Sequence, residues 1–153
     1  TNMNITPETL LKLSELNNVI AIKEASGDMS QVARMKALCG DKIDIYSGND
    51  DQIIPILSLG GIGVISVAAN IIPKTVHDMC DLYLKGDCFK ATKLQLDYLE
   101  LMNNLFIETN PIPVKTAMNV IGMNVGELRL PLYKMNDKNK ETLVNTLKKY
   151  NLF

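Results

Sequence analysis

The sequence NNVIAIKEASGD, residues 17–28, joins an apolar run to a polar loop. The apolar residues at 19–22 predict a buried strand over 19–23, and Ser26 with Gly27 predicts the loop that ends it. Lys23 therefore lies at the carboxyl end of the strand. Parallel α/β folds carry their functional groups at this end of the sheet.

Alternation along the strand separates small side chains from bulky ones. One side carries Val19, Ala21, Lys23 and Ala25, and the other carries Ile20, Ile22 and Glu24. The small side leaves room for a ligand beside Lys23, whereas the bulky side is typical of a face packed against helices. The alternative is a lysine that extends into solvent, with Glu24 as an ion-pair partner.

Strands and helices alternate over the first part of the chain. Thr6 before Pro7 predicts the start of the first helix, Asp28 or Ser30 predicts the cap of the second, and Gly40 predicts its end. The predicted order is helix 7–16, strand 19–23, helix to residue 40, strand 42–47, helix 50–59, strand 62–70 and helix 71–86, then helices at 87–108, 113–121 and 138–150. This order predicts an α/β fold with a parallel sheet. Three parallel strands leave two open edges, which indicates that part of the sheet is missing from this chain.

The composition argues against several classes of function. The chain has 153 residues, 46% of them hydrophobic, and a formal net charge of -1, so it can bury a core and offers little to attract nucleic acid. We expect no membrane partner, because no apolar run approaches the roughly 20 residues of a membrane span. The polar first residues are not typical of a signal peptide. Cys39, Cys80 and Cys88 form no CxxC pair and His77 is the single histidine, so we expect no metal site and a reducing, cytoplasmic location.

A lysine in an apolar pocket can act as a nucleophile. The amine reacts only when neutral, and burial can lower the pKa of a lysine from about 10.4 to roughly 7–8. The neutral amine can form a Schiff base with a carbonyl substrate, and the protonated imine lets the adjacent carbon become a nucleophilic enamine. Lys23 is therefore the candidate catalytic residue, and we expect no cofactor.

Five separated stretches of the chain carry a family resemblance. They are VIAIKEASGD (19–28), YSGNDD (46–51), GGIGVISVAANIIP (60–73), ETNPIPVKTAMNVIGM (108–123) and LRLPL (128–132). In this order they closely resemble the C-terminal half of the dihydrodipicolinate synthase family. The wider superfamily of pyruvate-dependent aldolases includes N-acetylneuraminate lyase, and the NPIPVK block at 110–115 favours the synthases.

The resemblance implies a fold and three site residues. The family fold is a (β/α)8 TIM barrel followed by a C-terminal helical bundle, so residues 1–86 would hold about strands six to eight and residues 87–153 the helical region. Lys23 matches the lysine that forms a Schiff base with pyruvate. Gly48 matches a glycine close to the bound pyruvate, and Ile65 matches a residue that contacts pyruvate from the neighbouring strand.

The implied activity is the condensation of pyruvate with L-aspartate 4-semialdehyde to 4-hydroxy-tetrahydrodipicolinate, a step of lysine and diaminopimelate biosynthesis. Two alternatives stay open. The chain could belong to another pyruvate-dependent aldolase, such as N-acetylneuraminate lyase, or it could be an inactive half that needs a separate N-terminal half. The family's threonine pair, and a segment with a tyrosine and an arginine that ends at about Thr1, would precede this chain.

The resemblance also implies a homotetramer built as a dimer of tight dimers. The weaker interface of the family uses the helices after strands six and seven, which here points to Met29, Ser30 and Leu59. Two further motifs receive structural interpretations. The glycines of 60–63 precede a strand, which favours a tight turn over a phosphate cradle. Asn49, Asp50 and Asp51 are interpreted as a helix N-cap and first-turn acids and not as a metal site.

Overall fold

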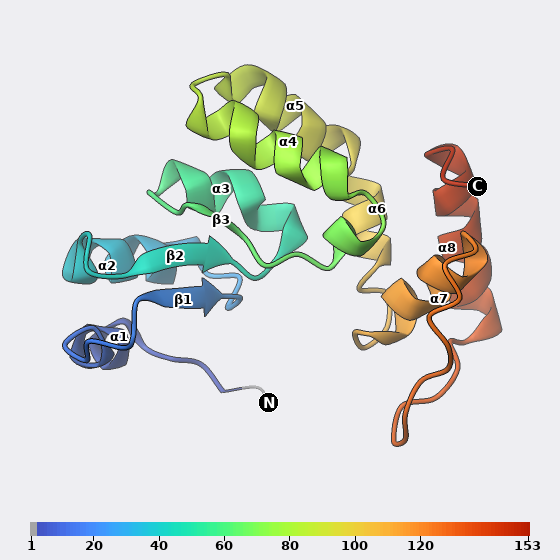
Figure 1. Ribbon diagram of the computed structural model, residues 1–153, viewed down its shortest axis with the longest axis horizontal. Coiled ribbons are helices and arrows are strands. Elements are labelled where there is room, and N and C mark those ends of the chain that lie inside the picture. Colours follow the sequence, from blue (N-terminus) through green and yellow to red (C-terminus); the bar gives the residue numbers. More distant parts are fainter. Residues whose placement is uncertain (1–2) are drawn as a thin grey trace.

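Three parallel strands form a sheet in the N-terminal part of the chain (Figure 1). The computed structural model describes residues 3–153, so the expectation about Thr1 lies outside the described residues. The strands are β1 (Ala21–Glu24), β2 (Asp44–Ser47) and β3 (Gly63–Val64), in the order β1-β2-β3. The predicted α/β fold with a parallel sheet is confirmed.

Helices follow each strand and continue to the end of the chain. They are α1 (Pro7–Leu13), α2 (Met29–Cys39), η1 (Asp50–Gln52), α3 (Ile53–Ser58), η2 (Ala68–Asn70), α4 (Pro73–Leu84), α5 (Cys88–Asp97), α6 (Leu99–Asn104), α7 (Ile112–Val120) and α8 (Asp137–Lys149), where η denotes a 3-10 helix. The single helix predicted over 87–108 is wrong, because the backbone of Tyr98 leaves helical geometry and separates α5 from α6.

The strand predicted over 62–70 is also wrong in its length. Only two residues of β3 pair with β2, and the chain then turns into η2. The backbone N–H groups of Val67 and Ala68 donate to the side chain of Asp50 rather than to a neighbouring strand. Just beyond β3, the Asp50 carboxylate thus accepts the backbone hydrogen bonds that a neighbouring strand would otherwise accept.

Side-chain caps explain where the first two helices begin. The Thr6 hydroxyl accepts a hydrogen bond from the Thr9 N–H at 3.3 Å. Asp28, rather than Ser30, caps α2, because its Oδ1 accepts from the N–H groups of Ser30 at 2.9 Å and Gln31 at 3.2 Å. These acceptors satisfy first-turn N–H groups that have no partner within the helix.

Two hydrophobic clusters hold the elements together. The first lies between α1, α2 and the sheet, and its buried members are Leu10, Ile22, Val32, Met35, Cys39, Ile43, Ile45 and Ile56. The second joins α3 and α4 to the helices of residues 87–153, with Met79, Leu101, Met102 and Leu143 fully buried in it. Each such side chain contributes about 1.5–3 kcal/mol of burial free energy. The later helices are therefore packed onto the helices that cover the sheet.

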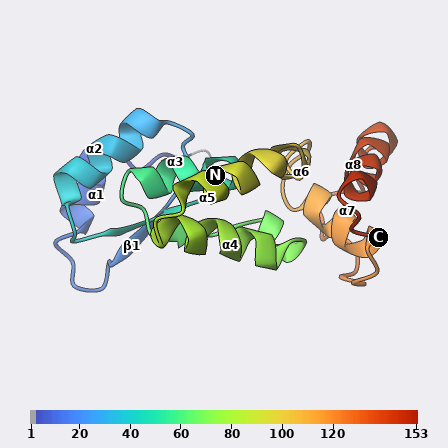
Figure 2. The ribbon, with the colours of Figure 1, turned by 90° about the horizontal axis from the view of Figure 1, so that it is seen from above.

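The last helices lie beyond the carboxyl ends of the strands. In both views the strands run toward α6, and α7 and α8 stand farther out at that end of the molecule (Figures 1 and 2). Helix α6 contacts η1, which directly follows β2. Within residues 3–153 no helix combines the length and the apolar composition that a membrane crossing needs.

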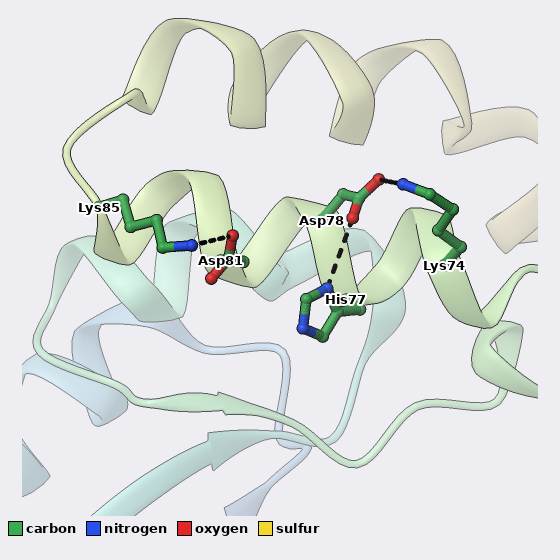
Figure 3. Close-up of polar contacts among 5 residues, drawn as sticks. All are labelled: Lys74, His77, Asp78, Asp81 and Lys85. Atoms are coloured by element: carbon green, nitrogen blue, oxygen red, sulfur yellow. Dashed lines mark hydrogen bonds and ion pairs between the residues drawn. The ribbon is translucent and has the colours of Figure 1, made fainter.

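The outer side of α4 is a charged surface (Figure 3). Lys74 Nζ donates to Asp78 Oδ2 at 2.5 Å, and Lys85 Nζ donates to Asp81 at 2.8 Å. His77 Nδ1 lies 3.4 Å from Asp78 Oδ1. The hydrogen bond from Lys74 is the main reason that the pKa of the Asp78 carboxyl falls below its usual value. His77 thus belongs to a solvated helix face and not to the strand ends.

Candidate active site

Lys23 lies on the open side of the sheet at the carboxyl end of β1. Exposure alternates along the strand, so Lys23 is exposed while Ile22 and Glu24 are buried. In the parallel register Lys23 pairs with Tyr46, and Tyr46 pairs with Gly63. Residues in register share one side of a sheet, so these three residues form a row across the open face.

Gly48 continues β2 and lies against Lys23. Its N–H donates to the Glu24 carbonyl oxygen at 2.6 Å. A Cβ at this position would lie 3.1 Å from Lys23 Cε. Gly48 is not among the glycines with positive φ, so close approach of the two strand ends, and not backbone conformation, requires glycine here.

Ile65 directly follows β3 and forms one more backbone hydrogen bond to β2. Its N–H donates to the Ser47 carbonyl oxygen at 2.8 Å. Ile65 stands two residues after Gly63 and therefore on the same side of the sheet as Lys23, and its side chain is 48% exposed. The structure thus brings Lys23, Gly48 and Ile65 to one edge and one side of the sheet.

Glu24 does not act as an ion-pair partner, which corrects that alternative. Its side chain is 4% exposed and points to the helix-covered side. Its Oε1 accepts from the Ser26 N–H at 2.7 Å, and its Oε2 accepts from Gln31 Nε2 at 3.4 Å. No salt bridge to Glu24 occurs among residues 3–153. The carboxylate therefore shapes the loop that follows the catalytic candidate.

The sequence patterns did not indicate two residues that lie near the site, Tyr46 and Asp50. Tyr46 lines the open face, and a Cβ at Gly63 would lie 3.3 Å from the Tyr46 ring. Alternation within the stretch 44–48 could have placed Tyr46 beside Lys23. Asp50, expected only as a first-turn acid, is buried and binds the loop after β3. No local pattern in the sequence signals that contact.

Two cavities in the described part of the chain lie away from Lys23. The larger of these two, of about 990 Å³, is lined by residues between 115 and 140. The smaller one, of about 330 Å³, lies between the loops after β1 and β2 and helix α6, and its walls include Asn49 and Phe106. The residues around both cavities do not include Lys23, which instead stands on an open sheet face.

The residues expected at a subunit interface lie at the two ends of the α2–α3 layer. Met29 and Ser30 begin α2, next to the carboxyl end of β1. Leu59 is the C-cap residue that follows α3, on the way to β3. Met29 and Leu59 are both half-buried against the first hydrophobic cluster. The expected contact residues therefore lie at the start of α2 and at the end of α3.

The fold and the site define a parallel α/β protein with a lysine at the carboxyl end of a strand. The model of the dihydrodipicolinate synthetase family matches residues 1–150. The chain belongs to this family. It is 68% identical over 151 residues to a 4-hydroxy-tetrahydrodipicolinate synthase of Clostridium novyi, an alignment that covers 99% of this chain and 51% of the relative.

Solved structures agree with this assignment. The chain matches a dihydrodipicolinate synthase from Thermotoga maritima with a TM-score of 0.94 and 41% identity, covering 98% of this chain and 52% of that one. It matches the chloride-inhibited enzyme of Acinetobacter baumannii, solved with pyruvate, with a TM-score of 0.95 and 34% identity, covering 100% and 53%. The chain spans about half the length of the relatives it matches.

Proposed function

We propose that this chain is the C-terminal part of a (β/α)8 barrel, with about strands six to eight in residues 1–86 and a helical bundle in residues 87–153. The open edges of β1 and β3 and the exposed side of Lys23 support this arrangement, since parallel sheets are covered on both faces in complete proteins. We call the chain combined with the remaining part of its relatives, joined or added as a separate half, the assembled barrel.

We further propose that the assembled barrel is a lyase of the aldolase type that condenses pyruvate with L-aspartate 4-semialdehyde. The product is 4-hydroxy-tetrahydrodipicolinate, an intermediate toward lysine and diaminopimelate. The observation that carries the proposal is the placement of Lys23 at the strand end, with Gly48 against its side chain and Ile65 on the same side. The names of the relatives favour this reaction over that of N-acetylneuraminate lyase.

The reaction begins with the Lys23 amine. The neutral nitrogen adds to the ketone carbon of pyruvate, and loss of water leaves an imine on Lys23. Loss of a methyl proton converts the imine to an enamine, whose carbon attacks the aldehyde carbon of the second substrate and re-forms the imine on Lys23. The amino group of the second substrate then attacks the imine carbon, which closes the ring and releases Lys23 as the leaving amine. In this proposal Gly48 and Ile65 contact pyruvate. The groups that move protons and bind the second carboxylate would come from the remaining part of the barrel.

The alternative is that the chain alone is inactive and needs its other half. The exposure of Lys23 favours this alternative for the isolated chain, because a Schiff-base lysine works in a pocket that excludes water. We propose that the assembled barrel forms a homotetramer with contacts near Met29, Ser30 and Leu59, and that it works in the cytoplasm.

The test is chemical trapping of the imine. The assembled barrel is incubated with pyruvate and borohydride, and peptide mapping locates the added mass. A reduced pyruvate adduct on Lys23, absent when pyruvate is left out, supports the proposal, whereas an unmodified Lys23 contradicts it. Trapping in the chain alone, run in parallel, decides whether the isolated half retains any imine chemistry.

A further inference from the structure

Asp50 connects the two loops that carry Gly48 and Ile65. Its side chain is almost fully buried, with 1% exposed. The carboxylate oxygen Oδ2 accepts hydrogen bonds from the backbone N–H groups of Val67 at 3.0 Å and Ala68 at 2.9 Å. Asp50 follows Gly48 by two residues, and Val67 follows Ile65 by two. A single oxygen therefore ties the loop after β2 to the loop after β3.

Gln95 holds Asp50 from the side of α5. This buried side chain donates through Nε2 to the Asp50 carbonyl oxygen at 2.8 Å, and its Oε1 accepts from the Ile54 N–H at 3.2 Å. Ile54 belongs to the first turn of α3, where N–H groups have no acceptor within the helix. The helical region thus fixes the position of the loop after β2 through two hydrogen bonds.

The contacts of Asp50 are difficult to replace. Buried N–H groups are costly to leave without an acceptor, and hydrogen bonds to an ionised carboxylate are stronger than those between neutral groups. The two loops cannot move apart without breaking both bonds to Oδ2. The second oxygen, Oδ1, is buried and has no hydrogen-bond partner within residues 3–153. The side chain therefore acts through one oxygen.

We infer that Asp50 is a positioning residue, which holds Gly48 and Ile65 at a fixed separation beside Lys23. The inference rests on the proposed function, in which Gly48 and Ile65 contact pyruvate. Both hydrogen bonds of the Asp50 side chain go to backbone N–H groups. Removing the Asp50 carboxylate should therefore weaken pyruvate binding, while Lys23 should still form the imine.

The test uses the Asp50→Ala variant of the assembled barrel. We expect the KM for pyruvate, and the pyruvate concentration that half-saturates borohydride trapping at Lys23, to rise about tenfold or more, with kcat within about threefold of wild type. Asp50→Asn keeps an oxygen for the two N–H groups but loses the charge of the carboxylate, so it should raise the KM less than Asp50→Ala does. Asp51→Ala is the matched control, because this neighbouring carboxylate is exposed.

A wild-type KM in Asp50→Ala would overturn the inference, and so would an Asp50→Asn variant as impaired as Asp50→Ala. If Asp50→Ala does not unfold cooperatively, Gln95→Leu replaces it. This variant leaves the carboxylate in place and removes the hydrogen bond to the Asp50 carbonyl oxygen, together with the acceptor of the Ile54 N–H. A raised KM in Gln95→Leu then supports the inference, and an unchanged KM overturns it. A wild-type barrel that shows no adduct at Lys23 removes the proposed function as well, whereas normal trapping with unaffected variants removes this inference alone.

Discussion

The side chain of Lys23 lies directly against Gly48. A methyl group at Gly48 would lie 3.1 Å from Lys23 Cε and 2.6 Å from Ala25 Cβ. The same position is held to the end of β1 by the hydrogen bond from its N–H to the Glu24 carbonyl. The carboxyl ends of the two strands are therefore so close that only a residue without a Cβ fits between them, and the Lys23 side chain lies against the position that such a Cβ would take.

Replacing Lys23 should remove imine formation and leave the fold intact. Lys23→Ala loses the amine that adds to pyruvate, and the exposed position at the strand end tolerates a smaller side chain. We expect no borohydride adduct and turnover reduced by at least about 10³-fold in the assembled barrel. Lys42→Ala, at an exposed lysine paired with Glu15, is the control. Turnover near wild type in Lys23→Ala would exclude a Schiff-base mechanism.

Adding one methyl group at Gly48 should disturb both stability and pyruvate trapping. In Gly48→Ala the new Cβ meets Ala25 Cβ and backbone, neither of which can move without shifting β1. We expect the free energy of unfolding, from urea titration, to fall by about 1–3 kcal/mol, with weaker trapping at Lys23. Gly63→Ala is the comparison, because its Cβ would meet only the Tyr46 ring at 3.3 Å. Equal losses in the two variants would contradict the role of the close approach.

A charge at Leu59 should separate the proposed tetramer into dimers. Two-fold interfaces bring the same patch of each subunit together, and an unpaired charge at a partly buried contact is unfavourable. Leu59→Asp should therefore sediment as a dimer with its cooperative unfolding retained. Leu96→Asp, on the exposed side of α5, is the control and should leave the tetramer unchanged. A tetramer that persists in Leu59→Asp combined with Met29→Asp would place the interface elsewhere.

Cys39 should make the protein less stable at alkaline pH. Burial raises the pKa of the Cys39 thiol, an effect that the nearby Lys42 ammonium only partly opposes. The unfolded thiol loses its proton above about pH 8.5 while the folded thiol keeps it, so the free energy of unfolding falls as the pH rises through this range. Cys39→Ala should show a shallower decline in urea titrations between about pH 7 and pH 9.5. Cys88→Ala, an exposed thiol, should decline like wild type, and an equal slope in Cys39→Ala would refute the prediction.

The positions of the strands and the side on which Lys23 lies were predictable from the sequence. Alternation of apolar and polar residues is a local property, and the burial of Ile22 and Glu24 around an exposed Lys23 follows it directly. The alternation was wrong at Ile20, which was expected on the packed side but is exposed, because the strand begins only at Ala21. The length of β3 was not predictable in this way. Its β-branched residues continue past Val64, but the bonds that Val67 and Ala68 form to Asp50 end the ladder.

The sequence by itself determined the alternating order of strands and helices and the lysine at a strand end, because periodicity, caps and turn residues act between near neighbours in the chain. Only the tertiary structure decided that Gly48 supports Lys23 and that Asp50 joins two loops. Asp50 and Val67 are 17 residues apart, and Asp50 and Gln95 are 45 apart. Such contacts depend on how the strands and helices pack in three dimensions, and no periodicity in the chain encodes which buried acceptor meets which distant N–H.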